Sequence, residues 1–190
     1  MTSTQAPIRV LHVDDDPSFT DLTVEFLKRE NDRFIIETAN SADEGLQRIT
    51  DRPPDCIVSD YDMPGENGIE FLERVREVDP GLPFVLFTGK GSEEIASDAI
   101  SAGVTEYLQK ETGTGQYAVL ANRISNVVRQ DRAEQSAEAI KRQYTRLIEE
   151  SSDVGTVLDS DGRFRYLSPA VERRLGYPAA ELLGRPLLEF

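Results

Sequence analysis

The sequence is poor in cysteine and histidine, lacks tryptophan, and contains no long apolar run. Its single cysteine, Cys56, excludes an intrachain disulfide framework and is expected to be an inert core residue. No apolar stretch approaches the ~20 residues that a membrane-spanning helix needs. Residues 1–7 lack the basic and apolar pattern of a signal peptide. We therefore expect a cytoplasmic protein that does not associate with a membrane.

Basic residues are also scarce. The 190 residues include 21 Lys+Arg against 35 Asp+Glu, and the net charge of −14 argues against binding nucleic acid through general electrostatics. Residues 1–130 hold 24 acidic and 12 basic side chains, whereas the remainder holds 11 and 9. The acidity therefore belongs to the first part of the chain. Only four residues are lysines, and an acidic, lysine-poor surface resembles that of halophilic proteins from a salt-rich cytoplasm. An ordinary acidic domain is the alternative.

Five short apolar runs alternate with helical patterns in the first two thirds of the chain. The predicted strands are residues 8–13, 34–38, 56–60, 84–87 and 105–108. Between them, Pro17 suits a first helical turn, Ser41 and Glu44 form a capping-box pattern, and Gly103 closes a helix. This alternation predicts an α/β fold, a flavodoxin-like, doubly wound, five-stranded parallel sheet of order 2-1-3-4-5.

Residues 116–148 show a helical pattern without glycine or proline. Leu120, Ile124 and Val127 form an apolar stripe that can cover the sheet. A second stripe has the 4-3-4-3 spacing of a coiled coil and consists of Ala133, Ala137, Ile140, Tyr144 and Leu147. It predicts a helix that leaves the domain and pairs with a copy of itself in a homodimer. A solvated linker helix is the alternative.

A new unit is expected to begin after Ser151-Ser152. Residues 155–158 and 163–167 are predicted strands, and Asp159-Ser160-Asp161-Gly162 is a hairpin signal between them. A unit of about 40 residues seldom buries enough surface to fold alone. We therefore predict three parts, namely a domain over residues 7–128, a linker or coiled-coil helix over 129–150, and a partial α+β unit over 151–190.

Polar side chains follow the predicted strands at the edge where the carboxyl ends of parallel strands meet. They are Asp14, Asp15, Asp60, Asp62, Thr88 and Lys110. Several carboxylates stay ionised together only if a divalent cation lies among them, and oxygen-only ligands indicate Mg²⁺. With the metal bound, Asp60 can attack a phosphoryl group while Lys110 neutralises charge and Thr88 binds a phosphoryl oxygen.

Four motifs resemble the signature of the response-regulator receiver domain. They are Val13-Asp14-Asp15, Asp60-Tyr61-Asp62-Met63-Pro64-Gly65, Thr88-Gly89 and Tyr107-Leu108-Gln109-Lys110. The resemblance implies a phosphoacceptor rather than an enzyme, phosphorylated by a histidine kinase or phosphotransfer protein in a two-component system. It implies that Asp60 is the phosphoacceptor, and that Asp14, Asp15, Asp60 and the backbone carbonyl of Asp62 hold Mg²⁺.

The resemblance also implies a switch. Thr88 and Lys110 would respond to phosphorylation, and Tyr107 would be the aromatic residue that swings inward. Glu111 follows Lys110 where the family usually has a proline, often in a cis peptide. Because a non-proline cis bond costs several kcal/mol, we expect a trans bond here.

The end of the chain resembles the start of a PAS sensor domain. The similarity lies in residues 162–184, where Ser168 stands at a position at which the family commonly has asparagine. A receiver, a helix and a PAS domain occur in this order in archaeal signalling proteins, some of which end in a histidine kinase. No kinase motif is present in this sequence, although a longer parent protein could carry one.

Other interpretations of the acidic residues stay open. Asp60-Tyr61-Asp62 resembles the DxD motif of haloacid-dehalogenase-type phosphatases, whose nucleophile lies on the first strand rather than the third. A degenerate receiver would serve as a protein-binding scaffold without phosphorylation. Calcium binding after Asp14 is rejected, because Phe19 occupies the position at which an EF-hand needs glycine. His12, the only histidine, is expected to pack in the core.

Overall fold

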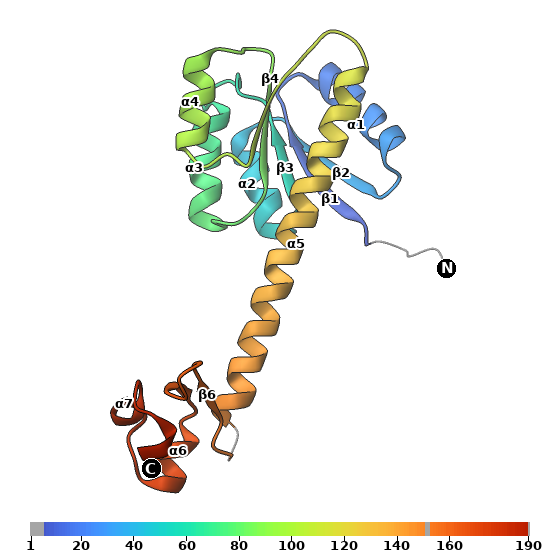
Figure 1. Cartoon of the computed structure of the whole chain (residues 1–190). Helices are drawn as coiled ribbons and strands as arrows, with labels where there is room; N and C mark the ends of the chain where they lie inside the picture. The colour runs from blue at the N-terminus through green and yellow to red at the C-terminus, as the bar shows by residue number, and fades with distance from the viewer. Residues whose placement is uncertain (1–5, 151–152, 190) are drawn as a thin grey trace. The chain divides into compact units, whose positions relative to one another are not determined.

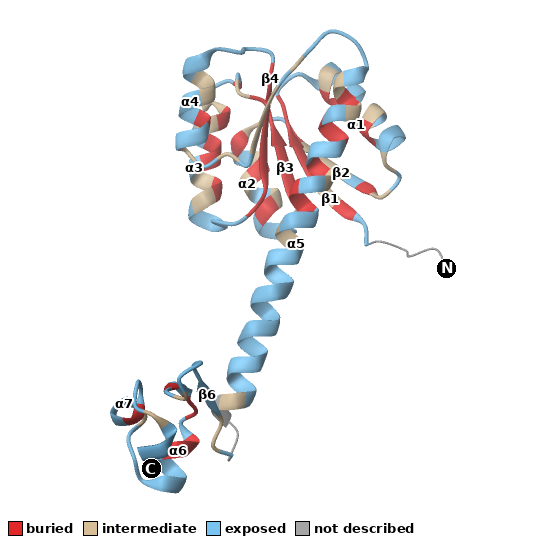
Figure 2. Cartoon of the chain, in the orientation of Figure 1, coloured by how far each residue is buried: buried red, intermediate tan, exposed pale blue. Residues whose placement is uncertain are grey.

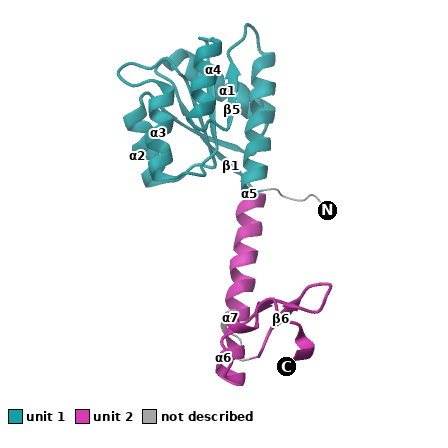
Figure 3. Cartoon of the chain, turned by 60° about the vertical axis from the view of Figure 1, so that its left-hand side comes forward, with its two compact units in different colours: residues 1–132 teal, residues 133–190 magenta. Residues whose placement is uncertain are grey.

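The computed structural model describes residues 6–150 and 153–189 (Figure 1), so the expected boundary at Ser151-Ser152 lies outside the described residues. The chain divides into two compact units, residues 1–132 and 133–190 (Figure 3). The first unit contains a five-stranded sheet and the second a two-stranded sheet. No helix among the described residues is long and apolar enough to cross a membrane.

The sheet of the first unit is parallel throughout and has the predicted order β2-β1-β3-β4-β5. Its strands are β1 (Ile8–Val13), β2 (Phe34–Ala39), β3 (Cys56–Ser59), β4 (Phe84–Thr88) and β5 (Glu106–Gln109). Strand β3 ends one residue earlier than expected. The backbone N–H of Asp60 still donates to the carbonyl of Val13 at 2.8 Å, which fixes Asp60 at the end of the central strands.

Five helices connect or follow these strands. They are α1 (Pro17–Glu30), α2 (Ala42–Asp51), α3 (Gly68–Val78), α4 (Glu93–Ser101) and α5 (Gly115–Glu150). The capping box expected at the start of α2 is only half formed. Ser41 accepts from the N–H of Glu44, but the Glu44 carboxylate accepts from Asn40 instead of Ser41. This hydrogen bond and Arg48 lower the pKa of Glu44. The complete capping box, Asn67 with Glu70, begins α3 and was not predicted.

Helices cover both faces of the sheet, and each face has its own apolar core. Val10 and Val58 point to the face covered by α1 and α5, whereas Leu11 and Ile57 point to the face covered by α2, α3 and α4. The central strands β1, β3 and β4 are buried almost throughout, whereas the edge strands β2 and β5 are partly exposed (Figure 2). The first predicted stripe of α5, Leu120, Ile124 and Val127, is buried against the sheet as expected.

The second unit contains the predicted hairpin. Strands β6 (Thr156–Leu158) and β7 (Phe164–Leu167) pair antiparallel, and the carboxylate of Asp159 accepts from the N–H groups of Asp161 and Arg163 in the turn. Helices α6 (Ala170–Leu175) and α7 (Ala179–Leu182) and the 3-10 helix η1 (Leu187–Glu189) follow. The small core of this unit consists of Phe164, Leu167, Val171 and Leu182. Ser168 is buried and accepts from the N–H of Gly155.

Gly68 allows α3 to begin directly beside the phosphoacceptor candidate. A Cβ atom on Gly68 would lie 2.2 Å from the backbone carbonyl of Asp60 and 2.8 Å from a methyl group of Leu86. The substitution Gly68→Ala is expected to lower the free energy of unfolding by about 1–3 kcal/mol through overpacking, as measured by urea denaturation.

Gly115→Ala is the matched control, because nothing lies within 4 Å of a Cβ atom added there. It is expected to leave stability unchanged or to raise it by roughly 0.5 kcal/mol through the unfolded state. Equal losses in the two variants would contradict the proposed close approach.

Candidate functional site

Three carboxylates and one ammonium group meet at the C-terminal edge of the sheet. One carboxylate oxygen each of Asp14, Asp15 and Asp60 lies within 4.8 Å of the others. Lys110 Nζ lies 2.9 Å from Asp14 Oδ2 and 3.0 Å from Asp60 Oδ1. Asp14 and Asp60 are buried, whereas Asp15 is exposed. The ends of β1, β3 and β5 therefore bring four of the predicted residues into one site.

The two contacts of Lys110 differ in kind. The contact with Asp14 is a hydrogen bond, whereas Asp60 Oδ1 accepts no hydrogen bond from any described residue. The short distance to Asp60 is thus an electrostatic contact without hydrogen-bond geometry. The side chains of Lys110, Asp14 and Asp60 are only 17%, 2% and 11% exposed, so their charges interact more strongly than they would at the surface.

The donor set fits a hard divalent cation. Three carboxylates contribute −3 and Lys110 contributes +1, which leaves −2 at the cluster. Mg²⁺ prefers oxygen ligands and keeps several bound waters. A cluster of carboxylates in which Asp15 is exposed to solvent suits it on both counts. Asp62 was expected to contribute its backbone carbonyl, and that role stays a prediction. Its side chain forms an ion pair with Lys90 Nζ at 2.5 Å.

The predicted switch residues Thr88 and Tyr107 both contact the backbone of Lys90. Thr88 Oγ1 accepts from the N–H of Lys90 at 3.0 Å, and the Tyr107 hydroxyl lies 3.5 Å from the Lys90 carbonyl oxygen. The hydrogen bond with Asp62 raises the pKa of the Lys90 ammonium. Thr88 is therefore bound to the β4–α4 loop rather than to Asp60. Sequence reasoning missed Lys90, whose only signal was that lysine is rare in this chain.

Lys110 reaches the carboxylates although proline does not follow it. The Lys110–Glu111 peptide bond is trans, as predicted. The N–H of Glu111 donates to Gln116 Oε1 at 3.0 Å, and Gln116 Nε2 donates to the carbonyl of Gly113. The first turn of α5 thus supports the loop that carries Lys110.

His12 and Cys56 lie in the core, as predicted, with His12 near the end of β1 that carries the site and Cys56 at the start of β3, at the opposite edge of the sheet. Burial, reinforced by the charge of Lys110, lowers the pKa of His12 to about 3, so the imidazole is neutral at physiological pH. Burial raises the pKa of the Cys56 thiol well above its usual range, which makes it a poor nucleophile. His12 is 1% exposed and Cys56 is fully buried, so neither side chain is accessible to a phosphoryl donor or to a thiol reagent.

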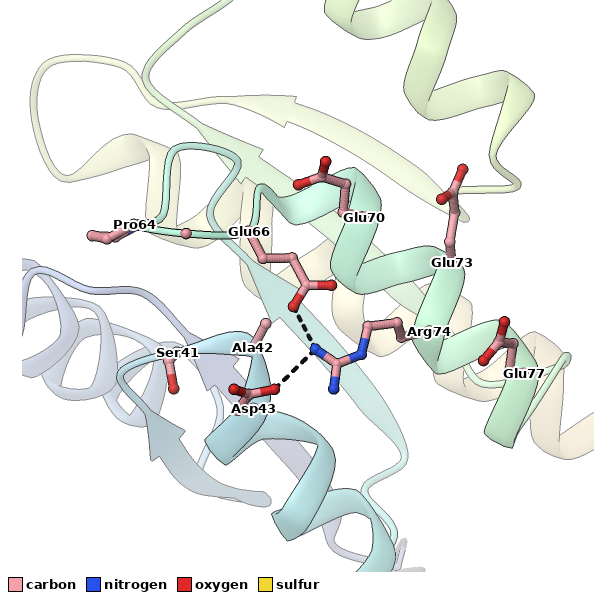
Figure 4. A pocket seen from close by; sticks show the side chains of 10 residues that line it. Ser41, Ala42, Asp43, Pro64, Glu66, Glu70, Glu73, Arg74 and Glu77 are labelled. Carbon is pink, nitrogen blue, oxygen red and sulfur yellow. Dashed lines mark hydrogen bonds and ion pairs between the residues drawn. The ribbon is translucent and has the colours of Figure 1, made fainter.

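A wide hollow of about 640 Å³ lies between α2 and α3, next to the Pro64-Gly65 turn (Figure 4). Arg74 bridges it, with Nη1 2.9 Å from Asp43 Oδ1 and 2.5 Å from Glu66 Oε2. These two carboxylates raise the pKa of Arg74. None of the sequence-predicted site residues lines the hollow, and the ion pairs in it are those of Arg74 with Asp43 and Glu66.

Comparisons with known proteins agree with this geometry. Residues 10–121 match the family model described as response regulator receiver domain, and residues 142–190 match the model described as PAS fold. The chain is 33% identical over 105 residues to the transcriptional regulatory protein TrcR of Mycobacterium tuberculosis, a match covering 55% of this chain and 40% of TrcR. It is 37% identical over 109 residues to an uncharacterized 14.6 kDa protein of Leptolyngbya boryana, covering 56% and 82%.

A CheY-like receiver domain protein from Methanospirillum hungatei JF-1 has a similar structure. Its TM-score is 0.61 at 28% identity, and the match covers 68% of this chain and 99% of that chain. The match spans half or less of the length of the first curated relatives, with 40% of TrcR and 50% of the Escherichia coli nitrate/nitrite regulator NarL covered. The similarity to these regulators therefore concerns the first unit.

Removing the Lys110 ammonium should make the carboxylate cluster more dependent on a divalent cation. Lys110→Met leaves Asp14 and Asp60 buried beside each other without a compensating charge, which is expected to cost about 3 kcal/mol of stability without metal. Mg²⁺ should then raise the thermal midpoint more than in the unaltered protein, because a ligand that binds the native state stabilises it.

The measurement is thermal unfolding with and without Mg²⁺, with Lys28→Met as the control for loss of an exposed lysine. A Mg²⁺ response in Lys110→Met no larger than in Lys28→Met would contradict the compensation of the carboxylates by Lys110, and no Mg²⁺ response in any of the three proteins would show that the carboxylates do not share a cation.

Proposed function

The chain belongs to the response-regulator receiver family, and from this premise we propose that Asp60 accepts a phosphoryl group from a histidine kinase or phosphotransfer protein. The observation that carries the proposal is the cluster at the sheet edge. Asp60 lies beside Asp14 and Asp15, and its carboxylate contacts Lys110 at 3.0 Å. A nucleophilic carboxylate, a metal-binding acid pair and a neutralising ammonium are the groups that aspartyl phosphorylation requires.

In the proposed reaction, a carboxylate oxygen of Asp60 attacks phosphorus while the bond from phosphorus to the leaving group breaks. The product is an acyl phosphate, and the leaving imidazole or acetate takes the electron pair. Asp60 Oδ1 accepts no hydrogen bond from the described residues, and charge alone holds the carboxylate next to the Lys110 ammonium at 3.0 Å. Mg²⁺ held by Asp14, Asp15, Asp60 and the Asp62 carbonyl would neutralise charge on the phosphoryl oxygens.

We propose that phosphorylation acts on the surface formed by α4, β5 and α5 through Thr88 and Tyr107. A phosphoryl group on Asp60 would offer the Thr88 hydroxyl an acceptor. The hydroxyl now donates to the Lys90 carbonyl oxygen at 3.5 Å and would have to leave that contact to donate to the phosphoryl group. Tyr107 contacts the carbonyl of the same residue. A movement of the β4–α4 loop would thus change both contacts at once.

The haloacid-dehalogenase-like alternative is less well supported, because Asp60 follows the third strand of the chain rather than the first. A degenerate receiver would keep the same residues without being phosphorylated. The two alternatives differ from the proposal in what they do with small phosphate donors, which makes one experiment decisive for all three.

The experiment is intact-mass measurement after incubation with acetyl phosphate and Mg²⁺ in high salt. We expect a phosphoryl-sized gain that requires Mg²⁺ and disappears in Asp60→Ala. Asp62→Asn is the matched control, because the proposal uses only the backbone carbonyl of Asp62. Turnover of small phosphomonoesters would favour the phosphatase. No gain with acetyl phosphate or a phosphorylated histidine kinase would favour the scaffold.

We further propose that α5 pairs with the same helix of a second copy. The predicted stripe lies in the part of α5 beyond the first unit, where Ile140, Tyr144 and Leu147 are 64%, 67% and 62% exposed. Large apolar side chains at coiled-coil spacing are not buried by the described chain itself, and a parallel partner helix would cover them. The helix would then connect the phosphorylation state of the first unit with the PAS segment.

The helix proposal predicts that Ile140→Glu weakens self-association. The substitution places a charge in the apolar stripe, so the mass measured by light scattering should fall toward that of one chain. Ala139→Glu is the control, since it adds the same charge to an exposed position outside the stripe. A monomeric unaltered protein, or equal effects of the two substitutions, would refute pairing through this stripe.

The excess of acidic side chains supports a last part of the proposal, that the protein works in a salt-rich, haloarchaeal-like cytoplasm. The chain has 35 acidic residues, 21 basic residues and only four lysines. Self-repulsion at net charge −14 destabilises the folded state, and salt screens that repulsion.

A further inference from the structure

Lys110 has a third neighbour that does not belong to the receiver motifs. Its Nζ lies 4.0 Å from the centre of the Phe19 ring on α1, and 5.8 Å from that of Phe87 on β4. An ammonium group over an aromatic face is attracted by the ring quadrupole, and the attraction grows when the pair is partly dehydrated. The Lys110 side chain is 17% exposed, so this contact competes with water far less than a surface pair does.

The start of α1 holds Phe19 in place beside the carboxylates. The Asp16 carboxylate accepts from the N–H groups of Ser18 and Phe19, at 2.9 and 3.2 Å, and thereby caps the helix. The N–H of Asp16 in turn donates to Asp14 Oδ1 at 2.9 Å. The ring is therefore tied by the helix cap to the same aspartate that accepts the hydrogen bond of Lys110.

Phe19 also contacts the aromatic residue that begins the long helix. Its ring centre lies 6.5 Å from that of Tyr117, in the first turns of α5, and Tyr117 stacks on Phe26 at 4.9 Å and 4°. Tyr117 is among the largest fully buried side chains of the chain. A displacement of the Phe19 ring would have to be accommodated by Tyr117.

This aromatic contact lies on the opposite face of the sheet from Tyr107. Phe19 packs against the core under α1 and α5, whereas Tyr107 packs against the core under α2, α3 and α4. A change transmitted through Thr88 and Tyr107 would therefore act on the face covered by α2, α3 and α4. A change transmitted from Lys110 through Phe19 would act on the face covered by α1 and α5.

We propose that Phe19 is a positioning residue, whose ring holds the Lys110 ammonium against Asp14 and Asp60 and couples it to Tyr117 of α5. This inference rests on the proposed function for its kinetic consequence, because Lys110 would have to move toward a phosphoryl group on Asp60. The positioning itself exists before phosphorylation.

The first test measures that positioning directly by NMR. Because the chain has four lysines, protein labelled with ¹³C at lysine Cε gives four side-chain resonances, and Lys110→Arg identifies the one of Lys110. The other three lysines are exposed. The ε-protons of Lys110 should be shifted upfield by the Phe19 ring current, and Phe19→Leu should remove most of that shift.

The second test measures the rate of phosphorylation by acetyl phosphate with saturating Mg²⁺. Phe19→Leu should be about 5- to 30-fold slower, and Phe19→Tyr, which keeps the aromatic face, should restore the rate to within about twofold. Phe26→Leu is the matched control, because Phe26 stacks on Tyr117 without contacting Lys110. It should keep both the Lys110 resonance and the rate.

The third test follows Tyr117 with fluorotyrosine labelling, and Tyr117→Phe identifies its resonance. Phosphorylation should shift the Tyr117 resonance in the unaltered protein but not in Phe19→Leu. A Tyr117 resonance that responds equally in Phe19→Leu would overturn the coupling, and equal Lys110 resonances and rates in Phe19→Leu and Phe26→Leu would overturn the positioning. If Asp60 is not phosphorylated at all, the proposed function fails while the ring-current test still decides the positioning.

Discussion

The compensation of two buried carboxylates by one ammonium is the interaction on which the candidate site depends. Asp14 and Asp60 side chains are 2% and 11% exposed, and Lys110 lies within 3.0 Å of both. Charges removed from water are tolerated only when they are paired. The two buried carboxylates therefore require the positive charge of Lys110 at this edge of the sheet. The order 2-1-3-4-5 places β1 beside β3 and thereby puts the two aspartates next to each other. Strand β5 lies parallel to β4, and Lys110 directly follows β5 at the same edge of the sheet.

The packing around the site follows from the same requirement. Strands buried on both faces need helices on both faces, and the two cores on either side of the sheet supply the rigidity that holds charged groups at fixed distances. Gly68 illustrates how little room is left, because a single additional carbon atom would collide with the carbonyl of Asp60. The phosphoacceptor candidate is thus held by backbone packing as well as by charge.

The strands and helices could be predicted from the sequence because their apolar residues recur at regular spacing. The side-chain contacts that depend on loop conformation could not be predicted. Apolar periodicity located all five strands, and the convergence of parallel strand ends was sufficient to group Asp14, Asp15, Asp60 and Lys110. No periodicity encodes that Glu44 would bond Asn40 rather than Ser41, or that Lys90 would pair with Asp62. The partners of these side chains lie in neighbouring loops. Tertiary packing determines the conformation of those loops, so the sequence pattern does not predict the contacts.

Thr88 and Lys110 each have their own set of neighbours. The neighbours of Thr88 lie in a loop, whereas those of Lys110 include aromatic rings of the core. Thr88 and Tyr107 depend on contacts with the backbone of Lys90, which lies in an exposed loop. Phe19 and Tyr117 depend on packed aromatic rings, of which Tyr117 is fully buried. A loop can reorganise over several ångströms, whereas a packed core accommodates only small displacements. If both routes operate, the loop changes the shape of the α4 and β5 surface, and the core can shift or tilt only the start of α5. Because α5 is one continuous helix from Gly115 to Glu150, a change at its first turns does not have to cross a loop to reach the exposed stripe.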